Sequence, residues 1–169
     1  MADNPFTDSS TAAAPASPPP APEKLDRAAI ARSDPAIMSD VSWFWWIAGL
    51  SLINTVMAHT GSDWGFAIGL GFTLIVDHAL QNFKVVALAI DLIAIGSFVG
   101  LGLLARKGHV WAFIVGAVLY AVDTLVYLVA MEWLGLIFHV IAVAFLIRGA
   151  RKLSAAIKDA RAAGVLASA

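Results

Sequence analysis

The chain contains no cysteine, and this absence excludes disulfide bonds, thiolate metal sites and cysteine nucleophiles. Charged residues are also scarce, since they make up 14% of the 169 residues, against about a quarter in soluble domains. The formal net charge is −1, so the chain carries no overall field that would attract nucleic acid. The basic residues near the C-terminus lack the aromatic or motif support that RNA or DNA binding requires. We therefore expect no disulfide framework and no nucleic-acid partner.

Recognisable catalytic motifs are missing as well. Ser51, Ser97 and Thr124 have no base at helical spacing that would activate a hydroxyl nucleophile. No His-x-x-His or His-Glu-x-x-His sequence occurs, and the Gly-Leu-Gly at 69–71 lacks the strand and further glycines of a dinucleotide-binding loop. The sequence therefore favours a protein without catalytic activity.

What the chain has in excess is hydrophobic sequence, at 60% of the residues and a mean hydropathy of +0.80. Because about 20 helical residues cross a membrane core of ~30 Å, four segments are long enough to span. The first opens with an aromatic belt of three Trp and one Phe. We predict an all-α integral membrane protein with transmembrane helices over 43–60, 84–105, 109–131 and 133–150. The first residues, MADNPFTDSS, lack the features of a signal peptide, so we expect the first span to be an uncleaved anchor.

The segment 61–83 is harder to place, because its apolar stretch is about half the length of a normal span. It carries Gly65, Gly69 and Gly71, and ends in Asp77 and His78. Non-helical backbone is tolerated at membrane depth only where protein or water satisfies it. We predict a re-entrant or half-inserted hairpin, in which the glycines allow a turn or tight packing, and keep a tilted full span as the alternative.

The two ends of the chain differ from the bundle predicted over 43–150. Residues 1–22 are rich in Pro, Ala and Ser, which predicts a disordered tail. Residues 23–42 predict short interfacial amphipathic segments interrupted at Asp34-Pro35. Residues 151–169 predict an amphipathic helix and tail, with Leu153, Ile157 and Ala160 on one stripe. In the last span, we expect the Arg148 side chain to extend towards the interface.

The distribution of positive charge predicts the topology. With four spans and a re-entrant segment, one side of the membrane holds ten of the eleven Lys and Arg residues and the other holds only Lys84. With five full spans, the division becomes seven to four. We therefore predict that both termini are cytoplasmic. The Ala-rich tails and the absence of cysteine favour a bacterial inner membrane.

Ionisable residues inside apolar segments are rare and usually mark a pathway, a paired site or a ligand site. Asp91, Asp123 and His139 lie in three different spans, and helix rise places them about 9–14 Å below the outer boundary. Asn54 reaches the same depth from the first span. The predicted layer, a candidate ligand or proton site, comprises Asn54, Asp77, His78, Asp91, Tyr120, Asp123, Tyr127 and His139. His59 and His109 lie at opposite span ends, where a solvated imidazole needs no special role.

The polar layer leaves three chemical interpretations open. A divalent metal such as Zn²⁺, Mn²⁺ or Fe²⁺ could be held by Asp91, Asp123, His139 and His78. The same groups could instead form a proton or ion path. The structural alternative is that Asp91 or Asp123 pairs with His139 or a tyrosine hydroxyl and fixes helix register. Separately, Gly96 and Gly100 form a small-xxx-small pattern typical of helix packing in membranes.

Three functions follow from these interpretations. The first, which we favour, is a small non-catalytic membrane protein that acts as an accessory or scaffold subunit or binds a small ligand. The second is an oligomeric ion or proton pathway that uses the buried Asp and His residues. The third is a membrane-embedded metal hydrolase. The expected partners are the lipid bilayer and either further copies of the chain or a larger membrane complex.

Overall fold

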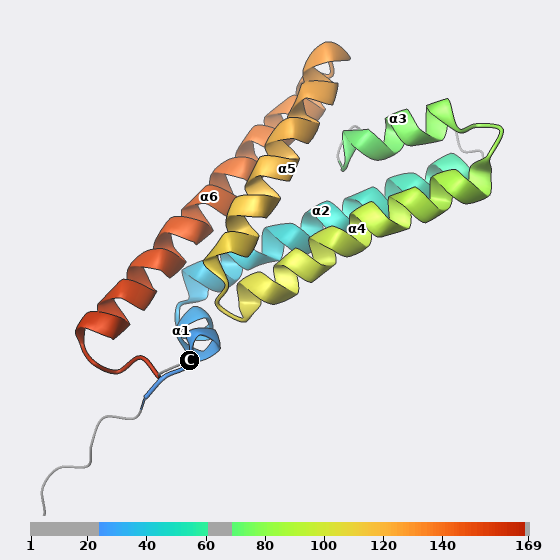
Figure 1. The fold of residues 1–169 in the computed structure, drawn as a ribbon. Helices are drawn as coiled ribbons and strands as arrows, with labels where there is room; N and C mark the ends of the chain where they lie inside the picture. The colour runs from blue at the N-terminus through green and yellow to red at the C-terminus, as the bar shows by residue number, and fades with distance from the viewer. Residues whose placement is uncertain (1–23, 61–68, 168–169) are drawn as a thin grey trace, which may run out of the picture.

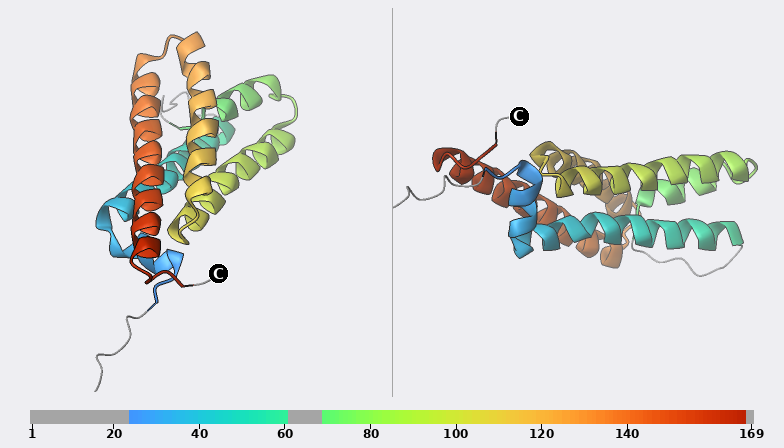
Figure 2. Two further views of the ribbon diagram at one scale, coloured as in Figure 1. Left: turned by 60° about the vertical axis from the view of Figure 1, so that its left-hand side comes forward. Right: turned by 90° about the horizontal axis from the view of Figure 1, so that it is seen from below.

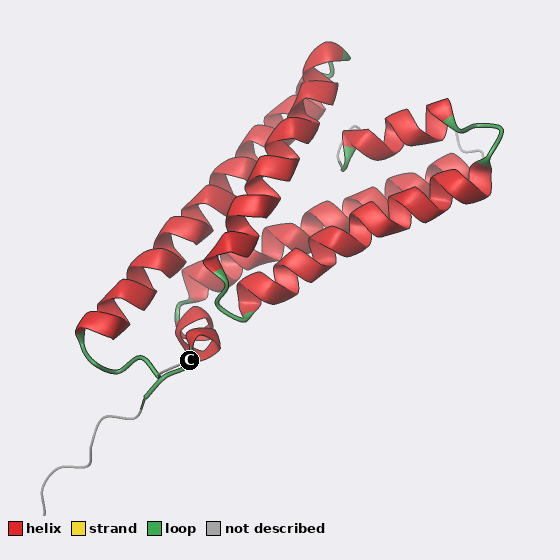
Figure 3. Cartoon of the chain, in the orientation of Figure 1, coloured by secondary structure: helices red, strands yellow, loops and turns green. Residues whose placement is uncertain are grey.

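The fold comes from a computed structural model, which describes residues 24–60 and 69–167. The regular elements among these residues are six helices (Figure 1, Figure 3). In chain order they are α1 (Arg27–Ser33), α2 (Pro35–Thr60), α3 (Gly71–Ala79), α4 (Lys84–Arg106), α5 (Val110–Val129) and α6 (Trp133–Ala162). The described residues therefore confirm that the fold is all-α, as predicted.

Four of the helices, α2, α4, α5 and α6, are long and apolar enough to cross a membrane. Each coincides with a predicted span, although α5 is shorter than the predicted 109–131, so the chain has helices suited to an integral membrane protein. Two of them are longer than predicted. α2 begins at Pro35 because 36–42 contains no glycine or proline to separate it from the first span. α6 continues to Ala162, so 151–162 is an extension of the last span and not a separate helix.

The helices form two pairs, with α2 beside α4 and α5 beside α6 (Figure 1). The pairs meet at the end of the bundle where α1 lies and spread apart towards the other end (Figure 2). The short helix α3 contacts α4 and α2 of one pair and α5 of the other. It therefore lies between the pairs, at the end where they diverge.

The core is densest where the two pairs meet. The Phe44 ring on α2 lies 6.4 Å from the ring of Phe98 on α4 and 5.7 Å from that of Phe113 on α5. Glycines allow this close approach, because a Cβ at Gly116 would clash with the Phe44 ring. Gly96 and Gly100 were predicted to pack in the same way, but nothing described lies within 4 Å of a Cβ built at either position. That pair faces away from the bundle.

An ion pair not foreseen in the sequence joins α2 to α6. The Asp40 carboxylate is fully buried, and it accepts hydrogen bonds from Nε of Arg148 at 3.1 Å and from Nη2 at 2.5 Å. The guanidinium carbon also lies 4.2 Å from the centre of the Phe145 ring. Arg148 therefore turns towards a carboxylate inside the protein, where the sequence had predicted only extension to the interface.

The two ends of the described chain lie side by side. Leu25 donates its amide to Val165 O at 2.8 Å, and Ala167 donates its amide to Leu25 O at 2.9 Å. Leu153 and Ile157, two residues of the predicted amphipathic stripe, are buried in the core near this end, where α1 also contacts α6. Their stripe therefore faces protein. Both described ends are at the same end of the bundle, where α1 lies (Figure 1).

The glycine contacts generate a stability prediction. We expect Gly116→Ala to lower the free energy of unfolding by about 1–3 kcal/mol, because the added methyl would displace the Phe44 ring in a packed core. Gly100→Ala is the matched control, since its methyl meets open space and alanine favours a helix. Denaturant unfolding in detergent, followed by circular dichroism, measures both. Equal stability of the two variants would contradict the packing described here.

Candidate functional site

The predicted polar residues do not form one layer but two clusters, one at each end of α3. We call them the Asp123 cluster (Asp123, His139, Ser51, Tyr120 and Tyr127) and the Asp91 cluster (Asp91, Asp77, His59 and Thr55). The first holds the N-terminal end of α3 and the second surrounds Asp77 in its last turn. The clusters differ in how completely their polar atoms are satisfied, and this difference decides which of them could bind a ligand.

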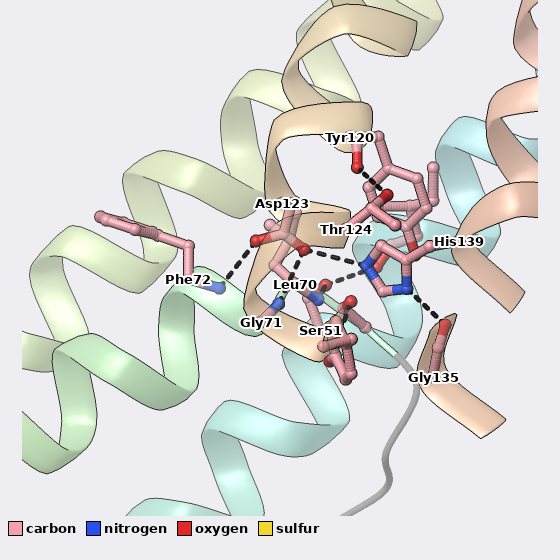
Figure 4. Close-up of polar contacts among 12 residues, drawn as sticks. Ser51, Leu70, Gly71, Phe72, Tyr120, Asp123, Thr124, Gly135 and His139 are labelled. Carbon is pink, nitrogen blue, oxygen red and sulfur yellow. Dashed lines mark hydrogen bonds and ion pairs between the residues drawn. The ribbon is translucent and has the colours of Figure 1, made fainter. Parts of the chain in front are cut away.

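In the Asp123 cluster, a carboxylate from α5 caps the N-terminus of α3 (Figure 4). Oδ2 of Asp123 accepts a hydrogen bond from the amide of Gly71, and Oδ1 accepts one from the amide of Phe72, both at 2.8 Å. The N-cap residue Leu70 makes no side-chain cap of its own. Since the first amides of a helix have no partner within it and carry partial positive charge, a carboxylate is the group that best satisfies them.

His139 completes this cap from α6. Its Nε2 lies 2.9 Å from Oδ2 of Asp123, and its Nδ1 lies 2.7 Å from the carbonyl oxygen of Gly135. Because a carbonyl only accepts, Nδ1 must carry a hydrogen. The Nε2–Oδ2 contact also needs one proton, which lies between the two groups. Asp123 and His139 therefore form a buried hydrogen-bonded pair that joins α5 to α6.

Two tyrosines enclose the imidazole. The Tyr120 ring stacks on it at 4.1 Å between centres and 10° between planes, and the Tyr127 ring lies at 4.3 Å. Such ring contacts fix the orientation of the imidazole. The Tyr127 hydroxyl donates to Gly69 O at 3.3 Å, whereas the buried Tyr120 hydroxyl has no hydrogen-bond partner in the described part of the chain.

The Gly-Leu-Gly segment at 69–71 lets α3 approach this closely. Gly69 has a φ of +144°, which L side chains rarely adopt, and a Cβ there would lie 2.7 Å from Nδ2 of Asn54. A Cβ at Gly71 would lie 2.7 Å from the Tyr127 ring. Between them, the Leu70 amide donates to Oγ of Ser51 at 2.9 Å. These contacts confirm the predicted use of Gly69 and Gly71 for a turn and tight packing, whereas Gly65 lies outside the described residues.

The Asp123 cluster is closed. Both carboxylate oxygens and both imidazole nitrogens have partners within the protein. The predicted structural alternative, in which Asp123 pairs with His139, is therefore confirmed. A metal could enter only by displacing α3 from its cap.

The Asp91 cluster is open by comparison. His59 on α2, Asp77 on α3 and Asp91 on α4 each place a ligand atom within 4.8 Å of the others. Nδ1 of His59 lies 3.8 Å from Oδ1 of Asp77. The Asp91 side chain is fully buried, and Oδ2 accepts a hydrogen bond from the Thr55 hydroxyl at 3.2 Å. Its other oxygen, Oδ1, has no hydrogen-bond partner among the described residues.

The surroundings of this cluster carry excess negative charge. Two carboxylates share it, and Asp77 also lies in the last turn of α3, where the helix dipole adds negative potential. His59 and Asp77 line a cavity of about 310 Å³, whose wall also includes the exposed Lys84. The His59 ring is held by both nitrogens, since Nε2 lies 3.1 Å from Lys84 O and Nδ1 lies 3.0 Å from Thr55 O.

Of the remaining predicted site residues, one lies at the Asp123 cluster and one lies outside both clusters. Asn54 is buried beside Gly69 at the Asp123 cluster, while His78 is exposed on α3 and belongs to neither cluster. The predicted metal ligands Asp91, Asp123, His139 and His78 are therefore not brought together around one point. Sequence analysis missed His59 because it lies at a span end. The available signal was the polar stripe at four-residue spacing formed by Ser51, Thr55 and His59.

The cap on α3 can be tested by substitution. We expect Asp123→Asn to weaken amide protection in 71–79 and to destabilise the fold by about 3–5 kcal/mol, because it removes one partner of a buried pair and weakens the acceptor of the α3 amides. Hydrogen–deuterium exchange on detergent-purified protein resolves the effect by segment. Asp159→Asn, at an exposed position on α6, is the matched control. Unchanged exchange in 71–79 would show that Asp123 does not hold α3.

Comparison with known proteins gives no match to a family model, to a curated protein or to a solved structure. The functional interpretation therefore rests on the geometry of the two clusters. Four membrane-spanning helices and buried acidic residues are compatible with a membrane protein, and the open cluster is where a ligand could be accommodated.

Proposed function

We propose that this chain is a non-catalytic integral membrane protein that binds a small cation at the Asp91 cluster. The observation that carries the proposal is the fully buried Asp91 carboxylate, whose Oδ1 has no protein partner in the described structure. A buried charge without partners is costly, and a cation removes that cost. The neighbouring Asp77 and His59 supply the further ligand atoms that a metal site requires.

The donor set favours a borderline divalent cation. One imidazole and two carboxylates suit Zn²⁺, Mn²⁺ or Fe²⁺ better than a soft ion, which would select thiolates. Ligand atoms at about 2.0–2.2 Å from such an ion must approach one another more closely than 4.8 Å, so binding would draw the three side chains inwards. The Nε2–H of His59 directed at Lys84 O is an orientation typical of ligating histidines. Nδ1 would then bind the metal in place of its present contact with Thr55 O, and it would release its proton on binding.

Cation binding would fix the second end of α3. Asp123 already holds its N-terminus, and a metal shared by His59, Asp77 and Asp91 would tie its last turn to α2 and α4. The proposal thus gives α3 two attachments of different kinds, one permanent and one dependent on the ion. This is the small-ligand form of the function favoured by the sequence.

The membrane placement is part of the same proposal. Nine residues of α3 extend about 14 Å, roughly half of a membrane core, so α3 fits a re-entrant segment that enters from the side of the Asp91 cluster. Both termini would then be cytoplasmic, as the charge distribution predicts. The bacterial inner membrane, inferred from the Ala-rich tails and the absence of cysteine, stays a prediction. Association with further copies or with a larger membrane complex stays a prediction.

An ion or proton pathway is the second candidate. The observation that favours it is that α3 contacts both a buried Asp–His pair and a buried carboxylate with one unpartnered oxygen in the described structure. Pathways use this combination of half-helix and buried acid. The hydrolase has less support, because the Asp123 and His139 groups assigned to it are committed to the α3 cap.

The cation site predicts stoichiometric metal binding. Protein purified in detergent without chelator or polyhistidine tag should contain about one divalent metal per chain by elemental mass spectrometry. Calorimetric titration of stripped protein with Zn²⁺ and Mn²⁺ should then show affinity at least about 10-fold weaker for Asp77→Asn and Asp91→Asn, which each remove a ligand.

Glu132→Gln, at an exposed acid in the turn before α6, is the control and should bind normally. If Asp91→Asn fails to fold, Asp77→Asn at a partly exposed position still decides the question. Folded wild-type protein that contains no metal and gives no titration would overturn the proposal.

The absence of cysteine makes the proposed topology directly measurable, because single-cysteine variants have no background. In intact cells, a cysteine at Gln81 should react with a membrane-impermeant maleimide, whereas one at Lys107 or Arg161 should react only after permeabilisation. All three positions are exposed in the structure. Labelling of Lys107 and Gln81 from the same side would contradict the assignment of α4 as a span. Labelling of a cysteine at the exposed Arg32, which precedes α2, from the side opposite to Lys107 would contradict the re-entrant placement of α3.

A further inference from the structure

A groove of about 770 Å³ runs along the seam between α5 and α6. Ala117 and Ala150 are buried at its base, whereas Val118 and Ile147 are exposed along its sides. The small alanine side chains on both helices create the hollow, because larger residues flank them. The groove is separate from both polar clusters, since none of their members lines it.

One end of the groove is polar and positively charged. Arg151, Ser154 and Lys158 line it, and their spacing of three and four residues places them on one face of α6. Arg151 and Lys158 are exposed and have no ion pair in the described structure. The first turn of α5 lies in the same wall at Val110 and has no side-chain cap, so its dipole adds to the positive potential.

The charged end lies at the depth of lipid headgroups. α6 has 30 residues, about 45 Å, and therefore extends well beyond a membrane core of ~30 Å. If Trp133 marks one boundary, about 20 residues bring the helix to the other boundary near Leu153. Arg151, Ser154 and Lys158 then straddle the interface, while the apolar part of the groove lies within the hydrocarbon.

We infer that this groove binds an anionic phospholipid. The phosphate would lie against Arg151 and Lys158 with the Ser154 hydroxyl as a further donor, and an acyl chain would follow the alanine base towards Ala121. Basic pockets between membrane helices are suited to anionic headgroups because each cation contributes attraction at the surface. The apolar part of the groove would hold the acyl chain, and its charged end would hold the headgroup.

A second copy of the chain fits this groove less well. In a two-fold dimer formed within a membrane, the same face of each copy meets at equal depth. The cations at 151 and 158 would then approach those of the partner, and like charges repel. Charge complementarity thus favours a lipid phosphate as the occupant.

The test is native mass spectrometry of protein extracted from vesicles of equimolar phosphatidylglycerol and phosphatidylcholine. Wild type should retain one phosphatidylglycerol in preference to phosphatidylcholine. Arg151→Ala with Lys158→Ala should weaken that retention by about 10-fold or more. Lys152→Ala with Arg161→Ala removes the same charge from positions outside the groove and should have little effect.

Two further variants separate the groove from general surface charge. Ala121→Trp fills the apolar part while leaving both cations, and it should also reduce retention; Val129→Trp, an exposed site outside the groove, should not. An equal loss in the two charge-removal variants would overturn the inference. So would a dimer that Ala121→Trp abolishes, since a second copy would then occupy the groove. These outcomes are independent of metal binding at the Asp91 cluster.

Discussion

The carboxylate of Asp123 on the first amides of α3 is the contact on which the arrangement of the bundle depends. A nine-residue helix has little stability of its own, because short helices gain most of their stability from packing and capping. Its free amides would be costly inside a membrane protein, where water cannot satisfy them. Asp123 satisfies two of them, and the hydrogen bond from His139 fixes the position of the carboxylate. This pair, together with the contacts of Ser51 and Tyr127 to residues 69–70, holds the start of α3 between the helix pairs.

The two helix pairs are held together in different ways at their two ends. Near α1, Phe44 packs between Phe98 and Phe113, and the buried Asp40 binds Arg148. At the other end the pairs diverge, and α3 with its polar contacts lies between them (Figure 2). One end therefore has a tightly packed aromatic core with one buried ion pair among the described residues, whereas the other contains both polar clusters. This asymmetry explains why both polar clusters occur around α3.

The two clusters contain similar residues but differ in their capacity to bind a ligand. In the Asp123 cluster every carboxylate oxygen and imidazole nitrogen has a protein partner, so the group is a structural element. In the Asp91 cluster one buried oxygen has no partner in the described structure, and two carboxylates lie close to one another beside a cavity. The clusters differ because backbone amides are free to donate hydrogen bonds near Asp123 but not near Asp77. Asp123 faces a helix N-terminus, whereas Asp77 lies in the last turn of the same helix, where no amide is free.

The sequence by itself determined that the chain is all-helical, that four helices can span a membrane, and that Asp91, Asp123 and His139 are buried. These properties follow from hydropathy and helix length, which are local. Only the tertiary structure decided that Asp123 joins His139 while Asp91 joins Asp77 and His59, because helix rise gives depth but not which helices are neighbours. The same reason explains the Asp40–Arg148 pair, which joins residues 108 positions apart. The burial of each residue could be deduced from the sequence. Which buried side chains contact one another depends on how the two helix pairs pack.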